Sequence, residues 1–370
     1  MRALVFGLAL SITGTAVAKD PTPTEVWKTD RDRATVTKPQ ISMPVRAGAL
    51  SLIKTGEASE NGKGIDNIAQ YESEDGEVFG TVYIFYPTYA DTALATYATD
   101  AAIRERFGKD PTIALDAVVP VAGIADGGIK RIYDNVALAP GKPLVTLAGF
   151  VRADSWMVVT RVTAPASRRA EADAAFDTLV AGLRFDGKAK PVPAMPLKMA
   201  AACPETSANR AETLADKNQA GMALLASLIG GSIVLEDKKG AKKGTASKDK
   251  SLPAFPNNGR SALCVSGATK DGHAILRPAS SADGNVAIIL LNDAGRMITA
   301  EPVLFGKGYT VKRYDIAQVE VFGSFETMPN NAQLSAMLDG SDKKGGKRRS
   351  RTVFTTDGNT SIEINSDALK

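Results

Sequence analysis

The stretch Val78-Phe-Gly-Thr-Val-Tyr-Ile-Phe-Tyr86 carries the clearest structural pattern in the sequence. It is rich in β-branched and aromatic residues, which favour extended strands. The turn Glu74-Asp-Gly-Glu77 precedes it and Pro87 ends it, so the pattern predicts one strand of a hairpin. Two further candidate strands lie upstream, at residues 41–54 and 65–71.

Strands and amphipathic helices alternate after this stretch. Thr88 or Asp91 is placed to cap a helix that reaches about Phe107, and a second helix is expected after Pro165. The order strands, helix, strands, helix predicts an α+β domain over residues 24–187, in which helices cover an antiparallel sheet. The remaining strands expected in this domain are 128–136, 144–151 and 156–163.

A second domain is expected over residues 198–370, after a Pro-rich linker at 188–197. It opens with a predicted long helix over about 207–229, and a short helix is expected to begin at Pro329 or Asn330. The predicted fold class is therefore α+β, with two domains whose antiparallel sheets are each covered by amphipathic helices. The strands predicted for the second domain are 261–266, 274–277, 285–291, 296–300, 318–325, 352–356 and 361–365.

One segment of the chain resembles a known family. The run Trp156-Met-Val-Val-Thr-Arg-Val-Thr-Ala-Pro165, with a following helix that ends in Leu183-Arg-Phe185, is similar to the end of PsbP-like exported domains. In those domains a strand with an aromatic-then-basic pattern leads through a proline into a last helix. The resemblance covers residues 150–187. It implies an α-β-α sandwich that binds or scaffolds rather than catalyses, and it supplies no site residues.

The first 18 residues have the composition of a secretory signal peptide. Met1-Arg2 gives a positive start, a mostly apolar run follows, and Ala16-Val-Ala18 has the small-x-small pattern that a signal peptidase cleaves. No cysteine directly follows this point, so no lipid anchor is expected. A later uncharged run, 220–234, is shorter than the roughly 20 residues that cross a bilayer, so no transmembrane segment is expected. These features predict an exported protein located in the bacterial periplasm.

Cys203 and Cys264 are the two cysteines of the chain. An even pair in an exported protein predicts one disulfide. The bond would close a loop of about 60 residues and contribute roughly 4 kcal/mol by the chain-entropy account. The alternative is a pair of unrelated buried thiols, which an oxidising compartment disfavours.

Two segments rich in Gly, Ser and Lys carry the positive charge. The chain has a net charge of +4, or +3 without Arg2; residues 237–250 contribute +4 and residues 342–351 contribute +5, which leaves −6 for the remainder. The two segments are predicted to be solvated and poorly ordered, and the alternative is that they bind anionic lipid or cell-wall polymer. The candidate anion-binding residues are Lys238, Lys239, Lys242, Lys243, Lys343, Lys344, Lys347, Arg348, Arg349 and Arg351.

Motifs that carry chemistry are scarce. The one histidine, His273, excludes His-cluster metal sites, and no Gly-x-Ser-x-Gly nucleophile motif accompanies it. Ser51-Leu-Ile-Lys54 has the Ser-x-x-Lys spacing but lies in a strand pattern, where residues three apart face opposite sides. No phosphate loop or calcium loop occurs, so no cofactor and no metal are expected. Export argues against nucleic acid as a partner.

These observations favour a non-catalytic binding or scaffolding protein with an unknown partner, and they leave enzymatic activity open. The first alternative is a protein tethered to the bacterial envelope through its two basic segments. The second is a serine hydrolase that relies on His273 as its general base.

Cleavage of the signal peptide is expected directly after Ala18. Mass spectrometry of the protein purified from its native compartment should give Lys19 as the first residue. A mature protein that still begins with Met1 would contradict export.

Overall fold

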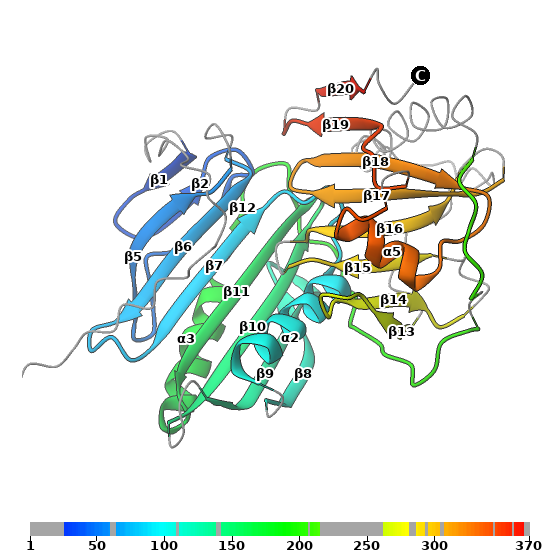
Figure 1. Cartoon of the computed structure of the whole chain (residues 1–370). Coiled ribbons are helices and arrows are strands. Elements are labelled where there is room, and N and C mark those ends of the chain that lie inside the picture. Colours follow the sequence, from blue (N-terminus) through cyan, green and yellow to red (C-terminus); the bar gives the residue numbers. More distant parts are fainter. Residues whose placement is uncertain are drawn as a thin grey trace, which may run out of the picture.

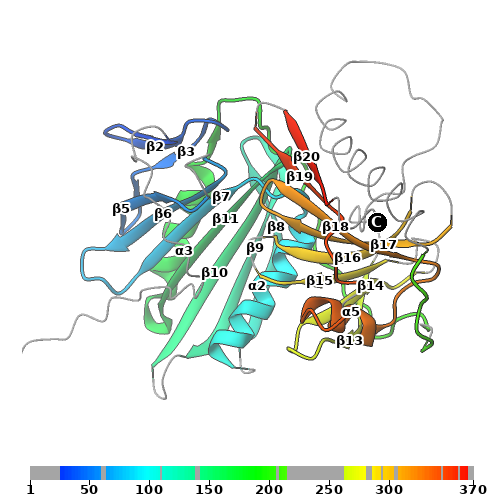
Figure 2. The same cartoon turned by 45° about the horizontal axis from the view of Figure 1, so that its top comes forward.

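Three antiparallel sheets form the structure, a computed structural model shown in Figures 1 and 2. The predicted signal peptide, the uncharged run 220–234 and the basic segment 237–250 lie outside the described residues. The structure describes residues 26–59, 64–108, 111–137, 142–205, 208–214, 262–280, 286–292, 295–303, 307–342, 345–356 and 359–365.

The first large sheet has eight strands in the order β4-β5-β6-β7-β11-β10-β9-β8. The hairpin expected from the sequence forms between β6 (Asp66–Ser73) and β7 (Phe79–Phe85), which pair in antiparallel register. The central strands β10 and β11 are buried on both faces, as their apolar sequences require. The other strands are β4 (Arg46–Ala47), β5 (Leu50–Glu57), β8 (Thr112–Val121), β9 (Ile124–Ala137), β10 (Pro143–Ala153) and β11 (Trp156–Pro165).

Two helices lie on opposite faces of this sheet. Lys130 of β9 contacts Asp177 of α3 (Arg169–Ala181) at 2.6 Å, whereas the next residue, Arg131, contacts Asp100 of α2 (Thr92–Phe107) at 2.5 Å. Successive side chains of a strand point to opposite faces, so the two helices are on different sides. A short 3₁₀ turn, η1 (Ala166–Arg168), joins β11 to α3.

A four-stranded sheet, with the strand order β1-β2-β3-β12, packs near β5 and the carboxyl-terminal end of α3. The Trp27 indole N–H donates to the Gly56 carbonyl of β5 at 2.9 Å. Arg33 reaches the Gly182 carbonyl, just after α3, at 2.7 Å. These two side chains fix the small sheet to its neighbours. Its strands are β1 (Trp27–Thr29), β2 (Arg33–Val36), β3 (Ile41–Pro44) and β12 (Arg184–Phe185).

The second large sheet is a meander whose eight strands pair in sequence order. One of its faces packs on α5 (Asn331–Leu338), around the buried side chains of Leu334 and Phe325. The side chain of Asn330 caps α5 and forms a reciprocal capping box with Gln333. The strands are β13 (Leu263–Ala268), β14 (Ala274–Pro278), β15 (Ala287–Leu290), β16 (Met297–Pro302), β17 (Tyr309–Asp315), β18 (Gln318–Phe325), β19 (Ser350–Phe354) and β20 (Thr360–Ile364).

The connection between β7 and α2 joins the two large sheets. The Ala317 N–H donates to the Tyr86 carbonyl at 3.0 Å, and the Thr88 N–H donates to the Asp315 carbonyl at 3.2 Å. One continuous hydrophobic cluster includes Val158 of the first sheet and Ile288 of the second. The two large sheets therefore share core packing.

The expected α+β class is wrong. Strands account for 50% of the structure and helices for 15%, and the sheets obtain much of their cover from one another. The long helix expected from residue 207 is also wrong where the structure describes it, because residues 208–214 are not helical and Thr213 bridges Phe325. The side-chain amide of Gln333 satisfies the Ala211 N–H and C=O at 2.7 and 2.9 Å, so this segment needs no helical hydrogen bonds there.

Gly149→Ala is expected to destabilise the first sheet. A Cβ at this position of β10 would lie 2.6 Å from the Phe176 ring of α3. Overpacking of this kind costs about 1–3 kcal/mol of unfolding free energy, measurable by denaturant titration. Adding Phe176→Leu should restore part of the loss. Equal stability of wild type and Gly149→Ala would contradict the close packing of α3.

Candidate functional site

The outer strand of the first large sheet, β8, exposes large apolar side chains. Ile113, Leu115 and Val118 have exposed fractions of 42%, 38% and 44%. β8 pairs with β9 on one side only, because it ends the strand order of this sheet. Its backbone N–H and C=O groups on the other side have no strand partner among the described residues. We call residues 112–121 the β8 edge.

A buried arginine holds the β8 edge to the body of the protein. Arg131 contacts Asp116 of β8 and Asp100 of α2, each at 2.5 Å, and Asp100 also accepts a hydrogen bond from the Tyr133 hydroxyl. Burial alone would lower the pKa of Arg131, but its ion pairs with the two aspartates outweigh burial and raise it. Burial and the negative charge of Asp100 raise the pKa of Tyr133 well above its usual value. Arg131 therefore stays charged and neutralises the only charged residue of β8.

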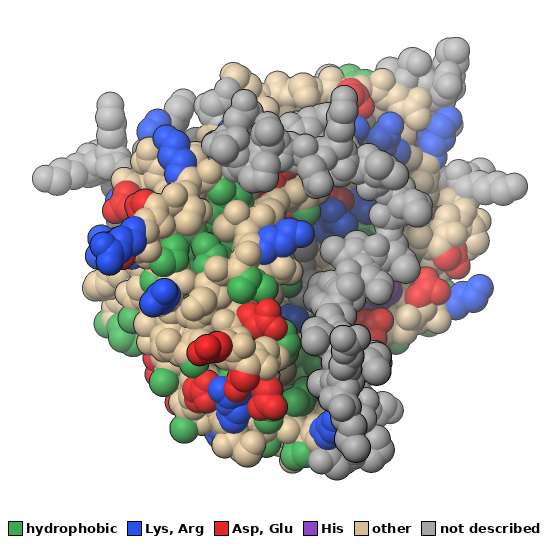
Figure 3. All heavy atoms as spheres, turned by 90° about the vertical axis from the view of Figure 1, so that its left-hand side faces the viewer, with side chains coloured by type: hydrophobic (Ala, Val, Ile, Leu, Met, Phe, Trp, Pro, Cys, Tyr) green, Lys and Arg blue, Asp and Glu red, His purple; other side chains and the backbone are tan. Residues whose placement is uncertain are grey.

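A second cation of β9 performs a similar role on the other face. The Lys130 ammonium group lies 2.8 Å from Asp173 and 2.6 Å from Asp177, both on α3, and 5.2 Å from the ring centre of Phe176. Surface charges elsewhere are also paired, and Figure 3 shows acidic and basic side chains next to one another on one face. Arg168, for example, binds Asp75 and Glu171.

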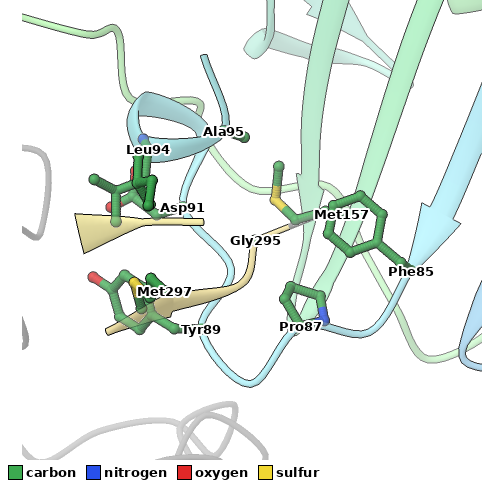
Figure 4. Close-up of a pocket in the computed structure, with 10 residues that line it drawn as sticks. Phe85, Pro87, Tyr89, Asp91, Leu94, Ala95, Met157, Gly295 and Met297 are labelled. Carbon is green, nitrogen blue, oxygen red and sulfur yellow. Dashed lines mark hydrogen bonds between the residues drawn. The ribbon is translucent and has the colours of Figure 1, made fainter. Parts of the chain in front are cut away.

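A small pocket lies where the two large sheets meet (Figure 4). Residues from the β7–α2 connection, the start of α2, β11 and the β15–β16 hairpin line it, among them Tyr89, Met157 and Met297. Its free space is about 10 Å³, roughly what one water molecule requires, so it is too small for an organic ligand.

Asp91 is the titratable carboxylate of this pocket. It caps α2 by accepting hydrogen bonds from the N–H groups of Ala93 and Leu94 at 2.8 and 3.0 Å. Burial raises its pKa above the usual aspartate value despite these hydrogen bonds. The pocket therefore has a structural role at the start of α2.

The predicted disulfide joins Cys203 and Cys264, whose Cα atoms are 5.3 Å apart. It links the segment after the linker to β13. Among the described residues, no group of three or more His, Cys, Asp or Glu side chains is arranged to hold a metal ion, and no helix there is both long and apolar enough to cross a membrane.

The second basic segment is packed against the protein where it is described, so the expectation of a poorly ordered loop is wrong for residues 345–351. Arg349 is buried, Arg348 pairs with Glu320 at 3.1 Å, and Arg351 donates two hydrogen bonds to the Gln318 side chain. The main chain from residue 350 onward forms β19 beside β18. Lys347, in the same segment, is exposed. The predicted candidates Lys238, Lys239, Lys242, Lys243, Lys343 and Lys344 lie outside the described residues.

His273 lies in the turn between β13 and β14. Its main chain exchanges hydrogen bonds with Thr269: the His273 N–H donates to the Thr269 hydroxyl, and the His273 carbonyl accepts from the Thr269 N–H. The Ser335 hydroxyl contacts this turn at a different residue, where it accepts a hydrogen bond from the Lys270 N–H at 2.8 Å. The described contacts therefore do not bring a serine hydroxyl to the imidazole.

Comparison with known proteins gives no family. No protein-family model and no curated protein matches the chain. Among solved structures, the chain is similar to a mutant of the protein Mog1, with 12% sequence identity and a TM-score of 0.30, over 43% of this chain and 97% of that one. No conclusion about fold or function rests on a similarity of this size.

Asp91→Asn is expected to change the pH dependence of stability. A carboxyl group whose pKa is higher in the folded than in the unfolded protein favours folding while it is protonated, and this contribution declines as pH rises above its unfolded value of about 3.9. Asparagine retains the capping oxygen and does not titrate. The melting temperature of Asp91→Asn minus that of the wild type should therefore increase from about pH 4 towards neutrality.

Asp75→Asn serves as the control for this measurement. Hydrogen bonds from Arg168, Ser73 and Glu77 lower the pKa of Asp75, so the sign is reversed: the substitution should cost stability at neutral pH and little in acid. Differential scanning calorimetry across the pH range measures both variants. Parallel curves for wild type and Asp91→Asn would show that the Asp91 carboxyl titrates normally.

Proposed function

We propose that the chain is an exported, periplasmic, non-catalytic binding protein, and that the β8 edge binds an extended segment of another protein. The single observation that carries the proposal is a ten-residue outer strand with exposed apolar side chains and no free charge. Strand addition to a sheet edge is an established mode of peptide recognition, in which main-chain hydrogen bonds supply affinity. The apolar amino-terminal segment and the disulfide support the exported setting.

Between its two register irregularities, at Leu115–Val119, the β8 edge is neither covered by another described strand nor left with an unpaired charge. Exposed edges are usually short, charged or covered. Asp116 is the only charged residue in β8, and Arg131 neutralises it. The strand therefore offers main-chain groups that have no strand partner in the described part of the chain, between side chains that are apolar or have their charge neutralised.

The other sheet edges in the described part of the chain do carry these features. On the opposite side of the same sheet, β4 has two residues, and the part of β5 beyond it carries Lys54 and Glu57. Residues 198–200 cover part of β13 through main-chain hydrogen bonds to Leu263. β20 has five residues, one of them Glu363. This contrast supports β8 as the proposed binding edge.

The register of β8 defines the segment that it can bind. Irregularities lie between Ile113 and Leu115 and between Val119 and Val121, so regular pairing with β9 covers Leu115–Val119. Pro120, just beyond, has no N–H to donate. A partner strand of about five residues, roughly 17 Å long, fits this stretch. Its side chains are expected to be uncharged, because they meet apolar groups on both faces of β8.

A second copy of the chain fits the edge less well than another protein does. Two antiparallel β8 strands are related by an axis perpendicular to the sheet, so the α3 helices of both copies would lie on the same face. α3 exposes Asp173 and Asp177, which share the single charge of Lys130. Like charges on neighbouring helices oppose such a dimer.

Leu115→Lys and Val118→Lys are expected to abolish binding at the β8 edge. A lysine there must lose water against an apolar partner, and charges of this kind block edge pairing. Peptides selected on the immobilised mature protein from a random display library should be extended and uncharged. Their affinity, measured by fluorescence polarisation, should fall at least about tenfold in both variants, or about 1.4 kcal/mol.

Ile53→Lys is the matched control, because Ile53 is an exposed apolar residue near the opposite edge of the same sheet. Binding should be unchanged in this variant. Selection that yields no peptide, or binding that survives both β8 substitutions, would refute the proposal. Self-association in sedimentation experiments that Val118→Lys removes would identify a second copy as the occupant.

A further inference from the structure

Arg277 of β14 is a buried cation for which the described residues supply no carboxylate. The residue is 3% exposed. Lys130, Arg131 and Lys312 are also buried, and each forms an ion pair with an aspartate or glutamate. No ion pair reaches Arg277 in the part of the chain that the structure describes. Burial lowers the pKa of Arg277, because the charged form has lost its water.

The hydrogen bonds of the Arg277 guanidinium use two of its three nitrogens. Nε donates to the Ser266 hydroxyl at 3.1 Å, and Nη2 donates to the Asn331 side-chain oxygen at 3.3 Å. Both partners are neutral, and the second contact is longer than a typical N–H···O hydrogen bond. Nη1 is buried and has no hydrogen-bond partner among the described residues. An acceptor is therefore missing at Nη1 and weak at Nη2.

The surroundings of this guanidinium favour a negative charge. α5 begins at Asn331, and the amino-terminal end of a helix carries partial positive charge. The Asn331 side chain lies close to β13, where its amide donates to the Ser266 carbonyl at 3.0 Å and where Gly267 leaves space for it. Farther along the same face of the sheet are the apolar side chains of Ala287 and Ala300, which provide no counter-charge.

We infer that Arg277 anchors a carboxylate-binding site between β13, β14 and the start of α5. A carboxylate has two oxygens at the spacing of the Nη1 and Nη2 donors, so it satisfies both at once. It replaces the long contact to Asn331 and supplies the missing negative charge. Because Nη1 is covered in this structure, the ligand reaches it when the side chains around the guanidinium move aside. The site lies on the second large sheet and does not depend on the β8 edge.

The probes are sodium acetate and sodium formate, compared with sodium chloride at equal ionic strength, on the full mature protein. Acetate and formate should raise the melting temperature in a saturable way, by about 2 °C or more at ten times the dissociation constant, whereas chloride should not. Saturation-transfer NMR on the acetate methyl group should report binding directly. Arg277→Met should remove both responses, because it keeps the size and loses the donors.

Two further variants make the result specific. Arg277→Lys keeps the charge but loses the fork of donors, so binding should weaken at least about tenfold, and this variant remains informative if Arg277→Met does not fold. Arg351→Met is the matched control, since Arg351 also binds a neutral side chain, that of Gln318, and should leave the acetate response intact.

Three outcomes would overturn the inference. The first is a wild type that binds neither acetate nor formate, and the second is an Arg277→Met variant that responds as the wild type does. A larger response to phosphate than to acetate at equal ionic strength would assign the site to a tetrahedral anion and overturn the carboxylate assignment.

Discussion

The ion pairs of Arg131 with Asp100 and Asp116 are the interaction on which the rest of this account depends. They connect α2, β9 and β8 through one buried guanidinium at 2.5 Å from each carboxylate. A buried charge is tolerated when it is paired with an opposite charge. Removing one member of the pair is strongly destabilising, because the other charge then stays buried without a partner. The same contacts neutralise Asp116, the only charged residue of the outer strand β8. The interaction that stabilises the first sheet therefore also gives its edge an uncharged surface.

Arg277 presents the opposite case on the second sheet. Its guanidinium is buried as deeply as that of Arg131, but its partners, Ser266 and Asn331, are neutral. Arg131 pairs with two carboxylates of the chain, whereas the described residues supply no carboxylate to Arg277. Each guanidinium also has one buried donor without a partner among the described residues, Nε at Arg131 and Nη1 at Arg277. Since a buried charge is rarely left without a counter-charge, the missing carboxylate points to a ligand at Arg277, whereas Arg131 has its counter-charges within the chain. Neither site contributes to the small pocket between the sheets, whose carboxylate, Asp91, caps a helix.

Local patterns in the sequence predicted the elements that depend on neighbouring residues. The β6–β7 hairpin follows from its turn residues and the disulfide from an even cysteine count, and Asp91, one of the two candidate caps, does cap α2. The β8 strand was missed because its apolar residues point to both faces and so lack the alternation of a half-buried strand. The α+β class was wrong because the two large sheets pack on each other through residues that are far apart in the sequence, and local patterns do not report such contacts. The roles of Arg131 and Arg277 could not be predicted for the same reason, since nothing in the sequence places Asp116 beside one and leaves the other unpaired.

Hydrogen exchange at β8, in the protein alone and with a bound peptide, tests the central claim most directly. Edge amides that face solvent exchange quickly, and a strand added at the edge protects them through main-chain hydrogen bonds. The account predicts slower exchange on peptide binding within residues 115–119, with no change in β5 at the opposite side of the sheet. Protection confined to any other part of the chain would show that β8 is not the binding edge.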